Sequence, residues 1–249
     1  MTPTTSRVRT DARVAVSLGL AFLGMGVLVA LSLLIVRADA PIVLARVSEY
    51  DQLNRLVTYQ GVVLVVTALI AAVTIRLVPT NFSLYFRVGR LDAPTLPVRA
   101  LGIKGTETWK SLGLTFSVVI SLVTAAIVLL PAARAGLALS PYLAGVAVLL
   151  AASNAFVEEY VTRFQVVVSL AGKVAPGRIA VISALLFGLP HYLGTPGQLI
   201  GVLAATFLGW FLAKSVLETR GLGWAWFVHF LQDVIIFVAI LGTLTPQAG

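Results

Sequence analysis

The sequence contains no cysteine, only two histidines and few charged residues for its length. The absence of cysteine excludes disulfide bonds and thiolate metal sites. Asp, Glu, Lys and Arg make up 11% of the 249 residues, against about 25% in soluble domains. Hydrophobic residues make up 59%, and the mean hydropathy is +0.99. These proportions exclude an ordinary soluble domain and predict a protein that crosses a membrane several times.

Long apolar runs divide the chain into predicted membrane-spanning helices, each of which needs about 20 apolar residues to cross roughly 30 Å of hydrocarbon. An interfacial or re-entrant segment within Phe82–Lys110 would add one more helix. We therefore predict an all-α, polytopic membrane helical bundle of about seven to eight transmembrane helices, forming one transmembrane domain over residues 1–249. The runs are Val14–Val36, Leu56–Ile75, Leu112–Leu130, Leu137–Val157, Ile179–Gly194, Leu199–Ala213 and Leu222–Leu244.

Lys and Arg are distributed unevenly between alternate loops, and this asymmetry predicts the orientation. Cytoplasmic loops carry an excess of these residues, which places the N-terminus, with residues 1–13 as a tail, on the cytoplasmic side of the plasma membrane. The net charge of +8 lies in these short loops, so we expect contact with membrane lipid and no binding of nucleic acid. The basic side would hold Arg7, Arg9, Arg13, Arg76, Arg87, Arg90, Arg99, Lys104, Lys110, Lys173, Arg178, Lys214 and Arg220, and the opposite side Arg37, Arg46, Arg55 and Arg134.

A few ionisable residues interrupt the apolar runs. Glu158, Glu159 and Arg163 follow the fourth run, and His191 and His229 lie within later runs. Ionisable side chains inside a membrane are energetically costly, and they normally line a polar cavity or have a function. These residues therefore indicate a buried active or transport site.

Helix spacing predicts which of these side chains meet. Glu158 lies 14 residues before Gly172, and His191 lies 14 residues after Gly177. An antiparallel hairpin that turns between the two glycines would bring Glu158 and His191 to the same depth, roughly 21 Å from the turn. Pro190 should end or kink the second helix of this hairpin. We therefore expect Glu158 to face His191.

Helical angles assign different partners to the two glutamates. Glu159 and Arg163 are four residues apart and can form an intrahelical ion pair. Glu158 points to another face and is the candidate general base. His229 and Asp233 are also four apart and project to one side. Two further residues complete the predicted site: Phe187 lies one turn before His191 and could form a wall, and Asn154 lies one turn before Glu158 on the same face.

The order and spacing of these motifs resemble those of the CPBP family, the CAAX proteases and bacteriocin-processing enzymes, also called Abi or type II CAAX prenyl endopeptidases. The motifs are Glu158-Glu159-x-x-x-Arg163, Phe187-x-x-x-His191 and His229-x-x-x-Asp233. The resemblance covers residues 137–244, which would form the catalytic core. The chain departs from the family pattern in Phe164, where many members have glycine, and in Asp233, where asparagine is usual. Phe164 is expected to crowd the helix face near the site.

The resemblance implies intramembrane endopeptidase activity. Glu158 and His191 would activate a water molecule, while His229 and Asp233 would stabilise the oxyanion, with Glu159, Arg163, Phe187 and Asn154 in support. The substrate would be a peptide or protein, with a prenylated C-terminus as one candidate. We expect no required cofactor. A catalytic zinc is the alternative, with Glu158, His191, His229 and Asp233 as its ligands, because such a site needs three N or O ligands and an open position.

Two other functions fit the same buried residues. A proton-coupled transporter could use Glu158, His191 and His229 as a relay, although the sequence has no internal repeat of the kind found in many transporters. A non-catalytic immunity or scaffold protein with the same fold is the other alternative, and Phe164 favours it. The sequence does not specify the oligomeric state.

Overall fold

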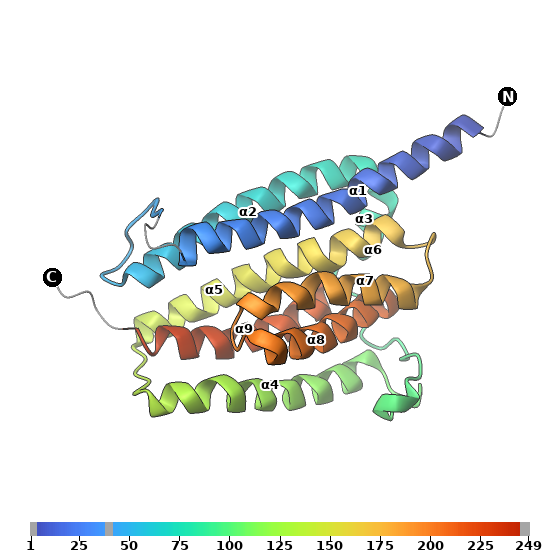
Figure 1. The fold of residues 1–249 in the computed structure, drawn as a ribbon. Coiled ribbons are helices and arrows are strands. Elements are labelled where there is room, and N and C mark those ends of the chain that lie inside the picture. Colours follow the sequence, from blue (N-terminus) through green and yellow to red (C-terminus); the bar gives the residue numbers. More distant parts are fainter. Residues whose placement is uncertain (1–3, 38–41, 245–249) are drawn as a thin grey trace.

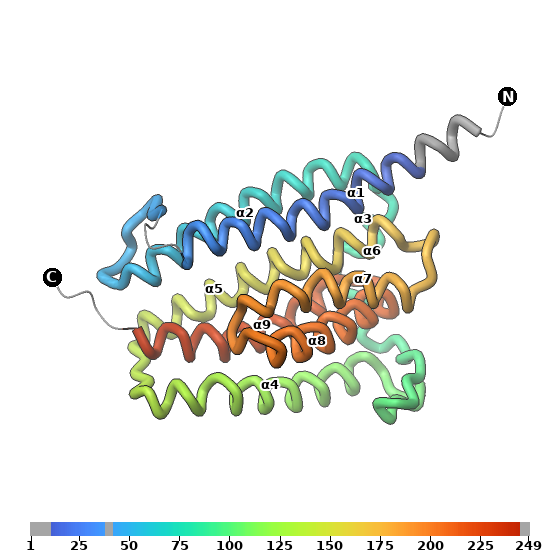
Figure 2. The backbone as a smooth tube through the Cα atoms, in the orientation of Figure 1, coloured from blue at the N-terminus to red at the C-terminus, as the bar shows by residue number. Residues whose placement is uncertain are grey.

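A computed structural model describes residues 4–37 and 42–244, with side chains from residue 11 (Figure 2). Part of the predicted tail, residues 1–3, therefore lies outside the described residues. Within the described ranges, regular structure is helical apart from two isolated β-bridges, Pro94 with Thr108 and Val98 with Ile103. The predicted all-α class is confirmed.

The helices run along the chain as follows, with shorter helical segments between them. The order is α1 (Thr4–Leu31) with a π-helical end (Ser32–Arg37), α2 (Asp51–Leu77), α3 (Pro79–Tyr85), a 3₁₀ turn (Arg99–Leu101), α4 (Trp109–Arg134), α5 (Pro141–Glu159), a π-helical turn (Tyr160–Phe164), α6 (Gln165–Leu170), α7 (Pro176–Gly188), a 3₁₀ turn (Leu189–Leu193), α8 (Gln198–Thr219) and α9 (Gly223–Leu241).

The long helices lie side by side in a layered bundle (Figure 1). In this view α1 and α2 form the upper layer and α4 the lower one, with α5 to α9 between them. Packing follows this arrangement: α7 packs along α8, and α9 packs between α5 and α4. The central layer therefore contains every residue of the predicted site.

Six helices in the described ranges are long and apolar enough to cross a membrane. They are Asp11–Arg37, Asp51–Leu77, Trp109–Arg134, Pro141–Leu170, Gln198–Thr219 and Gly223–Leu241. This confirms a multi-pass helical bundle. The segment Phe82–Lys110 contains no further long helix: α3 has only seven residues, and the remainder is loop with a single 3₁₀ turn.

The predicted span Ile179–Gly194 has a different form from the others. α7 has 13 residues, which at 1.5 Å per residue is roughly 20 Å, less than the thickness of the hydrocarbon layer. It ends at Gly188 and continues as the 3₁₀ turn that contains Pro190. The turn between α7 and α8 therefore lies partway along the length of the bundle, well short of the end at which α5 begins (Figure 1).

Sequence signals explain where the helices adjoining the site begin. Ser140 caps α5 by accepting a hydrogen bond of 3.2 Å from the Leu143 amide, and Pro141 occupies the first helical position. Thr108 caps α4 in the same way, by accepting a hydrogen bond from the Ser111 amide.

Buried polar contacts attach α1 to α6. The Gln165 side chain donates a hydrogen bond of 2.8 Å to the Ser17 carbonyl.

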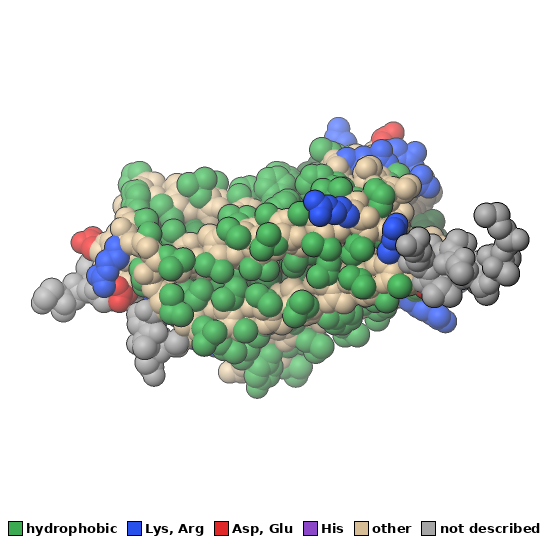
Figure 3. Space-filling view, turned by 90° about the horizontal axis from the view of Figure 1, so that it is seen from above, with side chains coloured by type: hydrophobic (Ala, Val, Ile, Leu, Met, Phe, Trp, Pro, Cys, Tyr) green, Lys and Arg blue, Asp and Glu red, His purple; other side chains and the backbone are tan. Residues whose placement is uncertain are grey.

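Hydrophobic and basic side chains separate along the bundle. In the view of Figure 3, hydrophobic side chains cover the middle of the molecule, and most of the visible Lys and Arg side chains lie toward one end. This is the end at which α4, α7 and α9 begin and α8 finishes. We refer to it as the basic end, and the positive-inside rule predicts that it faces the cytoplasm.

Candidate active site

The fourth span continues beyond the glutamates, and no proline or glycine interrupts it between Val146 and Leu170. α5, the π-helical turn and α6 form one span, Pro141–Leu170. Within the turn, the Gln165 amide bonds to the Tyr160 carbonyl five residues earlier. The hydroxyl of Thr162 donates to the Glu158 carbonyl at 2.7 Å. π-helical turns are rare and occur often at functional sites, because they change the direction of side chains within a helix.

His191 lies on the 3₁₀ turn that follows α7. Its Nδ1 lies 2.7 Å from the Phe187 carbonyl oxygen. A carbonyl can only accept, so Nδ1 carries the proton, and Nε2 of the neutral ring is an acceptor. Gly201 of α8 lies very close to this turn. A Cβ at residue 201 would be 2.6 Å from the His191 carbonyl oxygen, so this position requires glycine.

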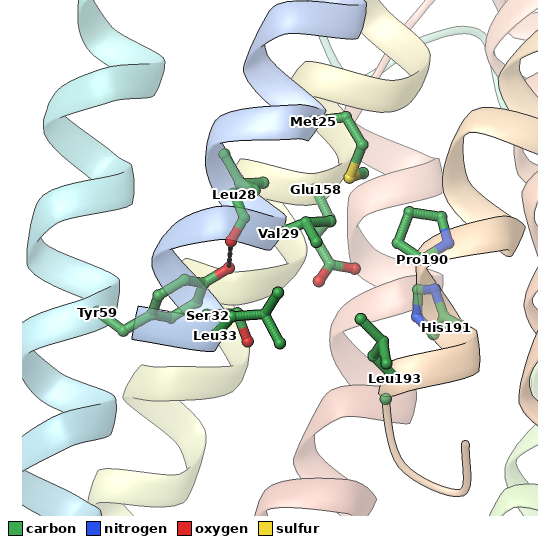
Figure 4. Close-up of a pocket in the computed structure, with 11 residues that line it drawn as sticks. Met25, Leu28, Val29, Ser32, Leu33, Tyr59, Glu158, Pro190, His191 and Leu193 are labelled. Atoms are coloured by element: carbon green, nitrogen blue, oxygen red, sulfur yellow. Dashed lines mark hydrogen bonds between the residues drawn. The ribbon is translucent and has the colours of Figure 1, made fainter. Parts of the chain in front are cut away.

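Glu158 and His191 line the same cavity, as the hairpin register predicted. The cavity has a volume of about 120 Å³ and is enclosed on the α1 side by Met25 and Leu28. The Glu158 carboxylate projects toward the segment that carries Pro190 and His191 (Figure 4). Its side chain is 20% exposed, so a small molecule in the cavity could reach it.

Asn154 holds the two outer carboxylates together. Its Nδ2 donates to Glu158 Oε1 at 3.2 Å and to Asp233 Oδ2 at 3.0 Å. Its own Oδ1 accepts a hydrogen bond of 2.8 Å from Gln60 of α2, and Ser153 donates to the Gln60 Oε1 at 2.8 Å. Asn154, a predicted helper, therefore links α5 to both α9 and α2.

Glu159 forms the predicted ion pair with Arg163, and both side chains are fully buried. Glu159 Oε1 also lies 2.7 Å from Nδ1 of His229. A carboxylate accepts, so Nδ1 of His229 donates and the ring is held with Nε2 toward the other carboxylates. Arg163 lies 4.0 Å from the centroid of the Phe187 ring, which also packs against His191 and His229 at 4.4 and 5.2 Å. Phe187 therefore lies beside Arg163 and both histidines, and its role as a wall of the site stays a prediction.

His229 completes the cluster through its second nitrogen. Nε2 lies 3.7 Å from Glu158 Oε2 and 3.5 Å from Asp233 Oδ1. Glu158 Oε2 has no hydrogen-bond partner among the described residues. Two carboxylate oxygens around one imidazole nitrogen favour a proton on that nitrogen, because an unprotonated lone pair would repel both. The cluster therefore places a proton donor beside a carboxylate oxygen that can accept one.

A second cavity adjoins the first. Its volume is about 370 Å³, and it lies against α4 on the other side of His191. His229 and Asp233 line its polar end, while Ile120, Val123 and Leu208 contribute to a mainly apolar wall. His191 lines both cavities. The cluster thus lies between a small cavity lined by Glu158 and a larger, mainly apolar cavity.

The zinc alternative, with Glu158, His191, His229 and Asp233 as ligands, stays a prediction. No group of three or more His, Cys, Asp or Glu side chains in the described ranges is arranged to hold a metal ion. We therefore derive no step through a metal.

Two features of the site differ from what the sequence analysis expected. Phe164 packs against Phe82 and Phe86 of the neighbouring α3 region, with ring centroids 5.1 and 5.5 Å apart, so this aromatic cluster accommodates its side chain. Gln60, which is 4% exposed, was not among the candidates. The signal that could have identified Gln60 is the presence of a glutamine within an otherwise apolar predicted helix.

The fold and these contacts define a multi-pass helical membrane protein with a buried carboxylate–imidazole cluster beside a cavity. The family model for the type II CAAX prenyl endopeptidase Rce1-like proteins matches residues 140–235, which is less than half of the chain. This segment contains all of the predicted site residues and lies within the predicted core, 137–244. The match confirms the resemblance to the CPBP family of CAAX proteases. Comparison with curated proteins and with solved structures gave no match.

Proposed function

We propose that this protein is an intramembrane endopeptidase of the CAAX prenyl protease type that hydrolyses a peptide bond without a metal. The observation that carries the proposal is that Glu158 and His191 line one small cavity, with His229 Nε2 3.7 Å from Glu158 Oε2. A carboxylate, an accepting imidazole and a donating imidazole are the groups that general acid–base hydrolysis requires.

The proposed reaction begins with a water molecule between Glu158 and His191. The Glu158 carboxylate takes up one proton from the water, and His191 Nε2 accepts a hydrogen bond from the other. The water oxygen attacks the carbonyl carbon, and the carbonyl oxygen takes up the negative charge. The proton on Glu158 then passes to the leaving nitrogen, the C–N bond breaks, and an acid and an amine are released. A base of this kind contributes about 10²–10⁴-fold in rate.

His229 is the proposed oxyanion donor. Glu159 accepts from its Nδ1, and Asp233 lies 3.5 Å from its Nε2, so the ring is held by two carboxylates from different helices. Asp233 also accepts from Asn154. We therefore assign Asp233 to the orientation of His229, which does not require Asp233 itself to be protonated.

The apolar cavity next to His229 suggests how a substrate could be held. A hydrophobic segment or a prenyl group could occupy this space of about 370 Å³ while the adjacent peptide bond reaches Glu158. Such a substrate could arrive laterally from membrane lipid. Nucleic acid has no part in this proposal.

The test uses the purified full-length protein in liposomes with a labelled peptide library that includes prenylated peptides. We expect cleavage by the wild type and a loss of about 10²–10⁴-fold in Glu158→Gln and in His191→Ala. Glu49→Gln is the matched control, because Glu49 is exposed on a loop outside the cluster. Cleavage by Glu158→Gln at the wild-type rate would reject the mechanism.

The same preparation separates the alternatives. Flux driven by a pH gradient, without cleavage of any peptide, would identify a proton-coupled transporter. A folded protein with neither activity would be the expected result for a scaffold. The packing of Phe164 against Phe82 and Phe86 weakens the argument for the scaffold function.

A further inference from the structure

A separate cavity of about 540 Å³ lies at the basic end of the bundle. It is bounded by the loop after α3, the turn between α6 and α7, and the C-terminal part of α8. Ile179 near the start of α7 lines it, whereas His191 lies 12 residues further along the chain, or roughly 18 Å away along a helix. No residue of the candidate active site lines this cavity.

The acidic group in the cavity is already neutralised. Glu218 pairs with Lys214, and both side chains are largely buried. Glu218 Oε2 also accepts hydrogen bonds of 2.9 Å from the Trp109 indole and from the Leu96 amide. Lys214 in turn donates to the Leu96 carbonyl at 2.8 Å. This pair fastens the loop to α8 and contributes little net charge to the cavity.

Two arginines supply the remaining charge. Arg90 and Arg220 line the cavity and are exposed, and their side chains form no hydrogen bond or salt bridge within the described part of the chain. Arginine guanidinium groups match the geometry of phosphate, which they bind through paired hydrogen bonds. The cavity therefore carries a net positive charge that is open to an anion.

Tyr85 adds a polar group that also lacks a partner. Its side chain is only 7% exposed and lines the cavity, yet its hydroxyl forms no hydrogen bond to any described residue. Burial raises the pKa of Tyr85, and the nearby charge of Arg220 opposes that rise. The hydroxyl is therefore a neutral donor near the charge of Arg220, on a side chain that is only 7% exposed.

The remaining wall is apolar. Val174, Ile179, Trp210 and Leu217 line the cavity beside the charged groups. A pocket that combines unpaired arginines with such a wall suits a molecule with an anionic head and a hydrocarbon chain. Its place at the basic end is also where anionic lipids attract Lys and Arg.

We propose that this cavity binds one anionic phospholipid, with its phosphate between Arg90 and Arg220, the Tyr85 hydroxyl donating to it, and an acyl chain along Trp210 and Ile179. A bound lipid would join the loop after α3 to α7 and α8, the two helices that carry and support His191. The site is independent of the peptidase proposal, since it shares no residue with the catalytic cluster.

The test measures retained lipid by native mass spectrometry, and thermal unfolding, on the full-length protein in detergent with added lipid. We expect phosphatidylglycerol to remain bound and to raise the unfolding temperature, whereas phosphatidylcholine does neither. Arg90→Gln combined with Arg220→Gln should weaken phosphatidylglycerol retention at least tenfold. Arg46→Gln combined with Arg134→Gln removes the same charge from exposed positions at the other end and should leave retention unchanged.

Tyr85→Phe keeps the ring and removes the hydroxyl, so it should weaken retention less than the arginine pair does. Equal binding of both lipids would overturn the proposal, as would equal loss in the two arginine pairs. Equal stabilisation by inorganic phosphate alone would indicate a phosphate site without the lipid chain. Displacement of the lipid by an acidic peptide at equal concentration would indicate a peptide site, which also contradicts the proposal.

Discussion

Gln60 on α2 donates a hydrogen bond of 2.8 Å to the amide oxygen of Asn154 on α5. Because the Asn154 oxygen is engaged, its NH₂ group must face Glu158 and Asp233, where it donates to both. Gln60 lies outside the segment that matches the family model. The N-terminal half of the chain therefore fixes the orientation of a group inside the catalytic core.

Gln60→Leu should reduce activity by about tenfold, because the unpaired Asn154 oxygen costs about 1–3 kcal/mol and its amide can turn over. Peptide cleavage in liposomes measures this effect, with kcat affected more than KM. Gln52→Leu, an exposed position on the same helix, is the control and should be neutral. Unchanged kcat in Gln60→Leu would mean that Asn154 keeps its orientation without this bond.

Glu159→Gln should destabilise the fold, whereas Glu158→Gln should remove activity and leave the fold stable. Without Glu159 the fully buried Arg163 has no ion-pair partner, and breaking such a pair costs about 3–5 kcal/mol. Thermal unfolding in detergent measures the difference. The double variant Glu159→Gln, Arg163→Met should recover part of the loss, and a double variant no more stable than Glu159→Gln would contradict this account.

Asp233→Asn should retain activity within about tenfold, because the amide oxygen can still accept from Asn154 or from His229 Nε2. Asp233→Leu has neither ability and should lose about 10²-fold, as expected for a misplaced oxyanion donor. The comparison of kcat between the two variants is the measurement. Equal losses would show that the negative charge of Asp233 is itself required.

Gly201→Ala should lower activity through the position of His191. A Cβ at residue 201 would lie 2.6 Å from the His191 carbonyl oxygen, so the 3₁₀ turn would have to move. A displacement of about 1 Å can reduce catalysis by about 10²-fold. Gly145→Ala on α5 has open space and is the matched control. Full activity in Gly201→Ala would mean that the turn moves without a catalytic cost.

Removal of metal should leave cleavage unchanged, because the described side chains present no group arranged to hold an ion. The measurement compares kcat/KM after dialysis against a chelator with kcat/KM after zinc is added back. Loss of activity on dialysis that zinc restores would reject the metal-free mechanism.

The sequence predicted the central contacts because they follow from helix geometry. Equal spacing about the Gly172–Gly177 turn placed Glu158 and His191 beside one cavity, and spacing by four residues predicted the Glu159–Arg163 pair. Contacts between distant helices have no such periodic signal. The bond between Gln60 and Asn154 and the contact of His229 with Glu159 depend on how α2 and α9 rotate against α5, which one sequence does not specify.

The short form of α7 was also difficult to predict, although Pro190 marked its end correctly. Apolar composition continues past the proline to Gly194, so hydropathy alone does not reveal where the helix stops crossing. Local signals thus predicted the helices and the break. Tertiary packing decided that the chain turns back partway along the bundle.

The π-helical turn at Tyr160–Phe164 fixes the length of this region of the chain. One residue fewer would turn α6 by about 100° relative to α5, given 3.6 residues per turn. The Glu158 side chain would keep its direction, while the Gln165 side chain would rotate away from Ser17. An insertion or a deletion within this turn should therefore be poorly tolerated, and aligned relatives are expected to show no gap across it.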